Sequence, residues 1–154
     1  MMNTKMDMLE PGDHTAMICL ESPEMQRIAI EQLTEHGYKV HTGFSLEDIL
    51  LKLRAQTYDL LLVSDDFGGS KSAADNRVLR EAVHQGAAQR HKQFIVLVGA
   101  YATNDELQAF EQSVDLVIGQ ADFVHLRPLL RRGLSRTQEF YAPYQDVLQA
   151  TGKA

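Results

Sequence analysis

Three polar residues, Ser64, Asp65 and Asp66, follow an apolar run that begins at Tyr58. A serine hydroxyl can act as a nucleophile, and an aspartate carboxylate can accept a phosphoryl group or bind Mg²⁺. The run predicts a buried strand that carries these side chains to the edge of a sheet. A serine acts as a nucleophile only with a nearby base and an oxyanion hole, and no G-x-S-x-G elbow surrounds Ser64. We therefore expect no catalytic residues here, and we do not expect an enzyme.

Other sequence motifs for bound groups are also missing. The stretch from Gly68 to Ser72 resembles the end of a phosphate-binding loop, but it lacks the leading glycine and does not open a helix directly. No G-x-G-x-x-G occurs after any predicted strand. The six histidines show neither H-x-x-x-H nor H-E-x-x-H spacing, and Cys19 is the only cysteine. We expect no cofactor and no metal site.

Size and charge narrow the class of protein. The 154 residues, 44% of them hydrophobic, suit one domain with a buried core. A net charge of −6 argues against nucleic-acid and anionic-membrane partners. Residues 1–13 have no apolar run of signal-peptide length, and no run of about 18 apolar residues exists anywhere. We expect a cytoplasmic protein with a short disordered leader over residues 1–13.

Short apolar runs alternate with amphipathic segments from Thr15 onward. Pro23 suits a first helical turn that Gly37 ends, and Ser45 and Thr103 each precede an acid by three residues, as in a capping box. This alternation predicts a doubly wound five-stranded parallel α/β sheet, with ligands at the carboxyl ends of its strands. The expected strands lie near residues 15–20, 38–42, 58–63, 93–99 and 114–118, and the helices near 23–36, 45–55, 75–85, 103–112 and from 122 onward.

In their order and spacing, several of these segments resemble the receiver domains of response regulators over about residues 15–132. The matching segments are Pro23, Gly37 to Val40, Glu47 to Leu50, and Tyr58 to Val63. The resemblance implies a flavodoxin-like, receiver-like domain over residues 14–132 and a role in two-component signalling. The linker-like piece, residues 68–74, is expected as a loop after the third strand.

The resemblance also implies a site that this chain does not retain. Receivers hold Mg²⁺ between an acid pair after the first strand and a phosphoacceptor aspartate ending the third, with a hydroxyl residue ending the fourth strand and a lysine ending the fifth. Only Glu21 keeps the required chemistry, which makes the chain a divergent pseudo-receiver. The matched positions are Leu20 and Glu21 for the acid pair, Ser64 for the phosphoacceptor, Val98 or Gly99 for the hydroxyl, and Gly119 for the lysine.

Three functions follow from this pattern. The first is a non-catalytic signalling and protein-interaction module that is not phosphorylated at the usual position. The second is an atypical phosphoacceptor that uses Asp65 or Asp66 with Mg²⁺ and Glu21. The third is a flavodoxin-like module that binds a small molecule in the space vacated by the lost acids, lined by Leu20, Val98 and Gly119.

The helical pattern continues past the length a receiver needs, so we expect a helical extension over residues 133–154. Leu130, Leu134, Tyr141, Tyr144 and Leu148 follow a heptad spacing, and such a stripe usually needs a second surface. Pro143 predicts a kink or break within it. We expect this interaction seam to bind a protein partner or a second copy as a homodimer, and the alternative is that it folds back on its own domain.

Overall fold

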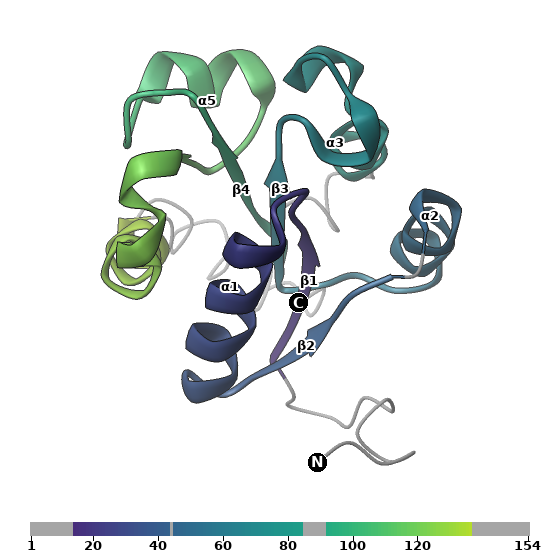
Figure 1. Cartoon of the computed structure of the whole chain (residues 1–154), viewed down its shortest axis with the longest axis horizontal. Coiled ribbons are helices and arrows are strands. Elements are labelled where there is room, and N and C mark those ends of the chain that lie inside the picture. The colour runs from purple at the N-terminus through teal and green to yellow at the C-terminus, as the bar shows by residue number, and fades with distance from the viewer. Residues whose placement is uncertain (1–13, 44, 85–91, 137–154) are drawn as a thin grey trace, which may run out of the picture.

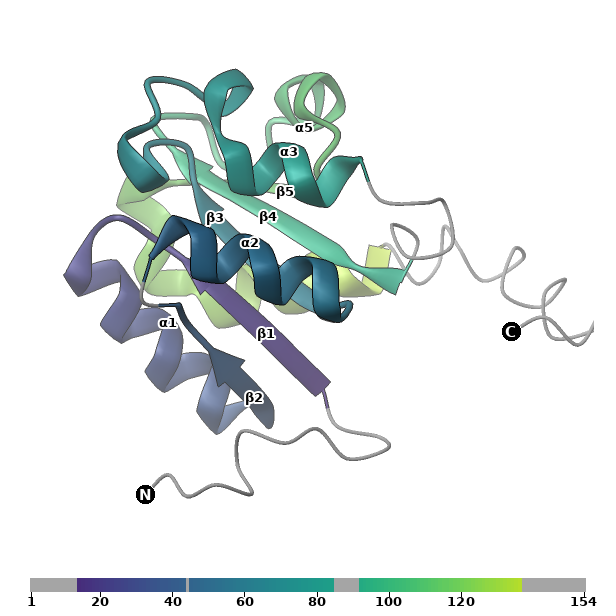
Figure 2. The same ribbon diagram turned by 90° about the vertical axis from the view of Figure 1, so that its right-hand side faces the viewer.

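The computed structural model describes residues 14–43, 45–84 and 92–136, which form one five-stranded sheet with helices on both faces (Figures 1 and 2). The strand order is β2-β1-β3-β4-β5 and every pair is parallel. The predicted doubly wound α/β architecture is confirmed. The strands are β1 (His14–Cys19), β2 (Tyr38–His41), β3 (Leu60–Ser64), β4 (Phe94–Gly99) and β5 (Leu116–Gly119).

Two apolar clusters, one on each face of the sheet, form the core. One cluster joins the sheet to α1 (Pro23–Glu35) and to the helix that runs through residues 126–136. The other joins it to α2 (Leu46–Ala55), α3 (Arg77–Val83) and the partly buried Ala109 of α5 (Glu106–Gln112). The central strands β3 and β4 are buried along their whole length, as parallel strands covered on both faces should be.

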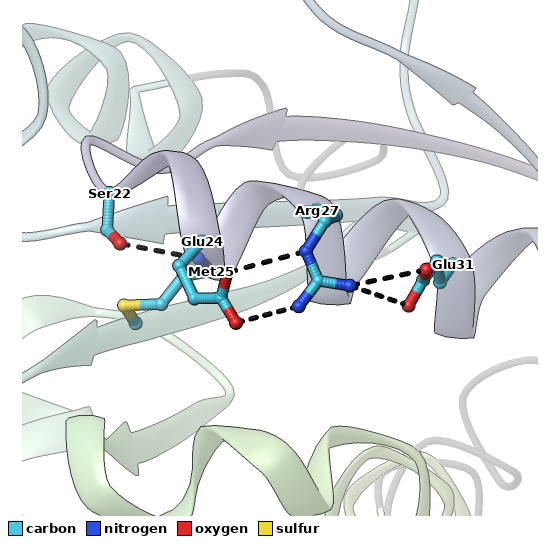
Figure 3. Close-up of polar contacts among 5 residues, drawn as sticks. All are labelled: Ser22, Glu24, Met25, Arg27 and Glu31. Atoms are coloured by element: carbon cyan, nitrogen blue, oxygen red, sulfur yellow. Dashed lines mark hydrogen bonds and ion pairs between the residues drawn. The ribbon is translucent and has the colours of Figure 1, made fainter.

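Local sequence signals explain where α1 and α2 begin and end. The Ser22 hydroxyl accepts the Met25 N–H at 3.3 Å and Pro23 opens α1, whose exposed face carries an Arg27 that pairs with Glu24 and Glu31 (Figure 3). Gly37, at φ +94°, ends this helix in a left-handed conformation that a side chain would strain. Ser45 caps α2 through the Asp48 N–H, as its sequence predicts.

The prediction that Thr103 caps a helix is wrong. The cap of α5 is Asp105, whose carboxylate accepts the Gln108 N–H at 3.0 Å, because α5 begins only at Glu106. Two further segments differ in extent from their predictions. Two 3₁₀ turns, η2 (Phe67–Gly69) and η3 (Ala73–Asp75), interrupt the loop predicted over residues 68–74, and α3 begins after them at Arg77 with Asn76 as its cap.

The boundary predicted between residues 132 and 133 falls inside a packed helix. A 3₁₀ turn, η4 (Gln120–His125), leads into the helix at residues 126–136, and Leu130 and Leu134 both pack against the domain's core. The helix therefore packs against the same core on both sides of this predicted boundary. The predicted leader, residues 1–13, lies outside the described residues. Among the helices that are described, none is long and apolar enough to cross a membrane.

Candidate functional site at the carboxyl ends of the strands

The sheet brings the predicted site residues to one edge. In the strand register, Cys19 is opposite Val63, Ser64 is opposite Val98, and Gly99 is opposite Gly119. The ends of β1, β3, β4 and β5 therefore meet, as expected for parallel strands. We call the eight predicted residues at this edge the strand-end site: Leu20, Glu21, Ser64, Asp65, Asp66, Val98, Gly99 and Gly119.

Ser64, at the position predicted for the receiver phosphoacceptor, is buried and holds three elements together. Its side chain is 5% exposed, and its Oγ accepts the Glu21 N–H at 2.9 Å. Its carbonyl accepts a hydrogen bond from the Asn76 Nδ2 at 2.9 Å. Asn76 is fully buried, and its Oδ1 also accepts the Leu79 N–H at 3.1 Å, which caps α3. Ser64 thus serves as a structural junction between β1, β3 and α3.

Of the positions predicted for the acid pair, only Glu21 carries a carboxylate, and the apolar Leu20 side chain is buried in the core. The Glu21 Oε1 accepts the Gly68 N–H at 2.9 Å. Gly68 has a φ of +71°, so its backbone adopts the left-handed conformation that glycine favours. The remaining acid of the pair therefore holds the loop that follows β3.

Asp65 and Asp66 face different surroundings. Asp65 is half-buried and its N–H donates to the Val98 carbonyl at 2.9 Å, which extends the β3–β4 ladder by one residue. Its carboxylate lies over Gly99, where an added Cβ would stand 2.5 Å from the Asp65 Oδ2. Asp66 is exposed. Across the described residues, no three His, Cys, Asp or Glu side chains gather as a metal ion would require.

Tyr101, in the loop after β4, is the polar partner of Asp65. Burial, then the charge of the Asp65 carboxylate, then a hydrogen bond to that carboxylate, raise the pKa of Tyr101 to about 12. Each effect disfavours a second negative charge beside Asp65. Asp65 is thus directed toward β4 and Tyr101, whereas the Glu21 carboxylate binds the loop after β3.

The loop that connects β4 to α5 covers the ends of β4 and β5. A Cβ at Gly119 would stand 2.5 Å from the Tyr101 carbonyl oxygen and 3.3 Å from the Thr103 Oγ1. The Thr103 Oγ1 accepts the Gly119 N–H at 2.9 Å and donates to the Asp122 carboxylate. The space beside Gly119, where the resemblance predicts the receiver lysine, is therefore occupied by the chain's own 100–103 loop.

The pocket expected for a small molecule does not form as predicted. Val98 is fully buried and Gly119 lies under the 100–103 loop, so neither lines an opening. Leu20 and Glu21 instead line a cavity of about 260 Å³ together with Gly43, Ser45 and Phe67. Sites for drug-sized ligands usually enclose about 300–1,000 Å³.

The sequence did not predict the role of four residues that shape this site, namely Asn76, Tyr101, Asp122 and Thr103, the last of which was predicted as a helix cap. Asn76 had a usable signal, because an asparagine directly before an apolar helical segment favours a cap. No local pattern pairs Thr103 with Asp122, which are 19 positions apart, or Tyr101 with Asp65. These contacts depend on the loop lying across the strand ends.

The predicted interaction seam is divided. Leu130 is 1% exposed and Leu134 is partly buried against the same core, so these two side chains pack inside their own domain. Tyr141, Tyr144 and Leu148 lie outside the described residues. Cys19 is fully buried, and burial raises the pKa of its thiol, as expected for an inert small hydrophobic residue.

Comparison with known proteins identifies the fold. No protein-family model and no curated protein matches the chain. Among solved structures, the chain is similar to the chemotaxis response regulator CheY4 of Vibrio cholerae, with a TM-score of 0.61 and 13% identity, over 81% of this chain and 98% of that one.

Two further solved structures agree. The response regulator TrrA of Thermotoga maritima, crystallised with Mg²⁺ and BeF, matches with a TM-score of 0.55 and 20% identity over 78% of this chain and 98% of that one. The orphan response regulator HP1043 of H. pylori matches with a TM-score of 0.56 and 19% identity over 81% and 99%. The chain has the flavodoxin-like fold of receiver domains, and at these identities the likeness extends to the fold alone.

Proposed function

We propose that this chain is a non-catalytic signalling module, a pseudo-receiver that recognises a protein partner and does not accept a phosphoryl group at the usual position. The proposal rests on the receiver fold together with the chemistry of the strand-end site. Receivers act through a carboxylate nucleophile, a metal and a clamp for the product. Here Ser64 is at the nucleophile position, and its Oγ accepts a hydrogen bond from the backbone of Glu21.

The loop over Gly119 supports the proposal most strongly. The Tyr101 carbonyl oxygen and the Thr103 hydroxyl occupy the space where a side chain at position 119 would begin. A lysine at this position would require that loop to move. The negative Asp65 carboxylate, beside a Tyr101 phenol that stays neutral at ordinary pH, supplies no positive charge to hold phosphoryl oxygens.

Phosphorylation by a small-molecule donor tests the proposal. The protein is incubated with acetyl phosphate and Mg²⁺ and its intact mass is measured, beside an active receiver as a positive control. We expect no adduct on the natural chain. An adduct with the mass of one phosphoryl group that is absent from Asp65→Asn or Asp66→Asn would contradict the proposal and support the atypical phosphoacceptor.

A second variant in the same phosphorylation experiment restores a carboxylate at position 64. In Ser64→Asp a carboxylate returns to the matched position, while the hydroxyl and lysine positions remain Val98 and Gly119. We expect this variant also to remain unmodified while it keeps its fold, as judged by circular dichroism. Rapid modification of Ser64→Asp would mean that the serine alone silences an otherwise competent site.

A further inference from the structure

A groove lined by both apolar and charged residues lies at the far edge of the sheet from β2, and its polar lining includes Asp105, Glu106 and Asp115. It encloses about 330 Å³ between α5, the edge strand β5 and the end of the helix at residues 126–136. Ala109 and Phe110 form its α5 wall, Leu116 and Val117 contribute from the strand, and Gly133 and Arg136 close the third side. This groove is separate from the strand-end site, with which it shares no residue.

The α5 wall is poorly covered by the rest of the described chain. No residue of α5 is fully buried, Phe110 is 83% exposed and Leu107, three residues earlier, is 69% exposed. Residues three apart on a helix lie on neighbouring positions of its surface. Phe110 lines the groove and Leu107 lies beside Phe110 on the helix surface, so the two exposed apolar side chains form a surface that favours being covered.

The described chain ends at this groove. Arg136 lines it, and the Arg136 guanidinium donates to the Asn104 Oδ1 at 3.3 Å and lies 3.8 Å from the Glu106 carboxylate at the start of α5. Residues 137–154 follow, and they include Phe140, Tyr141 and Tyr144. Phe140 follows Arg136 by four positions, a reach of up to about 14 Å, which brings these aromatic residues within range of the groove.

We propose that residues 137–154 dock in this groove of their own domain, with the aromatic side chain of Tyr141 or Tyr144 against Phe110. The heptad stripe already begins inside the domain, because Leu130 and Leu134 pack in its core. A segment attached beside its site by a short linker is present at an effective concentration of about millimolar. A second copy at micromolar concentration competes poorly with such a segment.

Docking would give the α5 edge two states. With the tail in place, the exposed leucine and phenylalanine of α5 are covered, and a protein partner that used this edge would first displace the tail. This inference does not depend on the chemistry of the strand-end site, so its test and the test of the proposed function are independent.

Tryptophan fluorescence tests the docking, because the natural chain contains no tryptophan. Two full-length variants, Tyr141→Trp and Tyr144→Trp, each carry one indole in the tail. We expect at least one to emit at shorter wavelength than the urea-unfolded protein, with the same maximum across a hundredfold dilution and with a monomer mass by light scattering. Adding Phe110→Asp or Leu107→Asp should shift that emission to longer wavelength.

The matched control is Leu51→Asp, which changes a similarly exposed leucine, 62% exposed, on α2. It should leave the emission unchanged. Solvent-like emission from both tryptophan variants would overturn the proposal. A short-wavelength emission that is lost on dilution, together with a dimer mass by light scattering, would also overturn it, because a second copy would then fill the groove. An emission maximum that stays unchanged in both α5 variants would overturn it as well.

Discussion

The two halves of the strand-end site are built in different ways. On the β1–β3 side, polar side chains remain but bind the protein's own backbone: Ser64 holds the Glu21 N–H and Glu21 holds the Gly68 N–H. On the β4–β5 side, side chains are absent at Gly99 and Gly119, and the loop that carries Tyr101 and Thr103 lies in their place. The first half keeps polar side chains that bind backbone donors, and the second half lacks side chains at its two glycines and is covered by the 100–103 loop.

The largest effect should come from Asn76, which supports the β1–β3 half. Asn76→Ala removes the donor to the buried Ser64 carbonyl and the cap of α3. An unsatisfied buried group costs about 1–3 kcal/mol and a lost cap about 1 kcal/mol, so we expect a loss of about 2–4 kcal/mol in the free energy of unfolding. Urea unfolding measures it. Asn76→Ser, which keeps a neutral cap acceptor without the amide donor, separates the two contributions. A near-neutral Asn76→Ala would refute the junction.

Gly119→Ala tests the β4–β5 half. The φ of Gly119 is −70°, which any residue adopts, so the expected loss of about 1–3 kcal/mol comes from the clash with the Tyr101 carbonyl alone. Gly99→Ala is the matched control. Its nearest neighbours are atoms of the Asp65 and Tyr101 side chains, which can rotate away, so it should cost less. If the two variants lose equal stability, backbone closure is not what distinguishes this half.

Tyr101 and Asp65 join the halves, and their coupling is visible at high pH. The folded pKa of Tyr101, about 12, lies above its ordinary value near 10. The stability contributed by the neutral phenol is therefore complete below pH 10 and is lost as the pH rises through 12. Asp65→Asn should lower the Tyr101 pKa part of the way toward 10, because burial remains.

Ultraviolet titration of tyrosinate, with Tyr101→Phe used to assign the signal, measures this shift. Tyr58 provides an internal reference, because burial raises its pKa to about 12 at a place without Asp65. Asp65→Asn should leave the Tyr58 titration unchanged. If the Tyr101 titration is equally unaffected, Asp65 does not face Tyr101 in solution.

The smallest effect should come from Glu21, whose side chain is exposed. Glu21→Gln retains an oxygen that can accept the Gly68 N–H, and we expect a change within about 0.5 kcal/mol. Glu21→Ala removes the acceptor and should cost about 1 kcal/mol at most. The urea midpoints of the two variants provide the comparison. A large loss in Glu21→Gln would show that the charge itself stabilises the β1–β3 half.

The fold was predictable because its signals are local. Apolar runs, the Ser22–Pro23 start of α1, Gly37 and the Ser45 cap each act within a few residues, and together they predict the alternating elements. The register of parallel strands then places Ser64, Val98, Gly99 and Gly119 at one edge without further information.

The side-chain contacts that close the strand-end site could not be predicted in the same way. Thr103 has the sequence context of a helix cap, yet its hydroxyl bridges the Gly119 N–H and the Asp122 carboxylate, because the loop crosses two strand ends. The direction of Asp65 likewise depends on Tyr101, 36 positions later, and on the space above Gly99. Such contacts follow from the assembled sheet and leave no periodic trace in the sequence.

The central claim is that the strand-end site does not bind a phosphoryl group. Titration of the ¹⁵N-labelled protein with Mg²⁺ and beryllofluoride, which mimics a phosphorylated aspartate, tests it most directly. We predict no saturable shift in the amide signals of residues 64–66, Gly99 or Gly119. Saturable, Mg²⁺-dependent shifts centred on Asp65 or Asp66 would contradict the account.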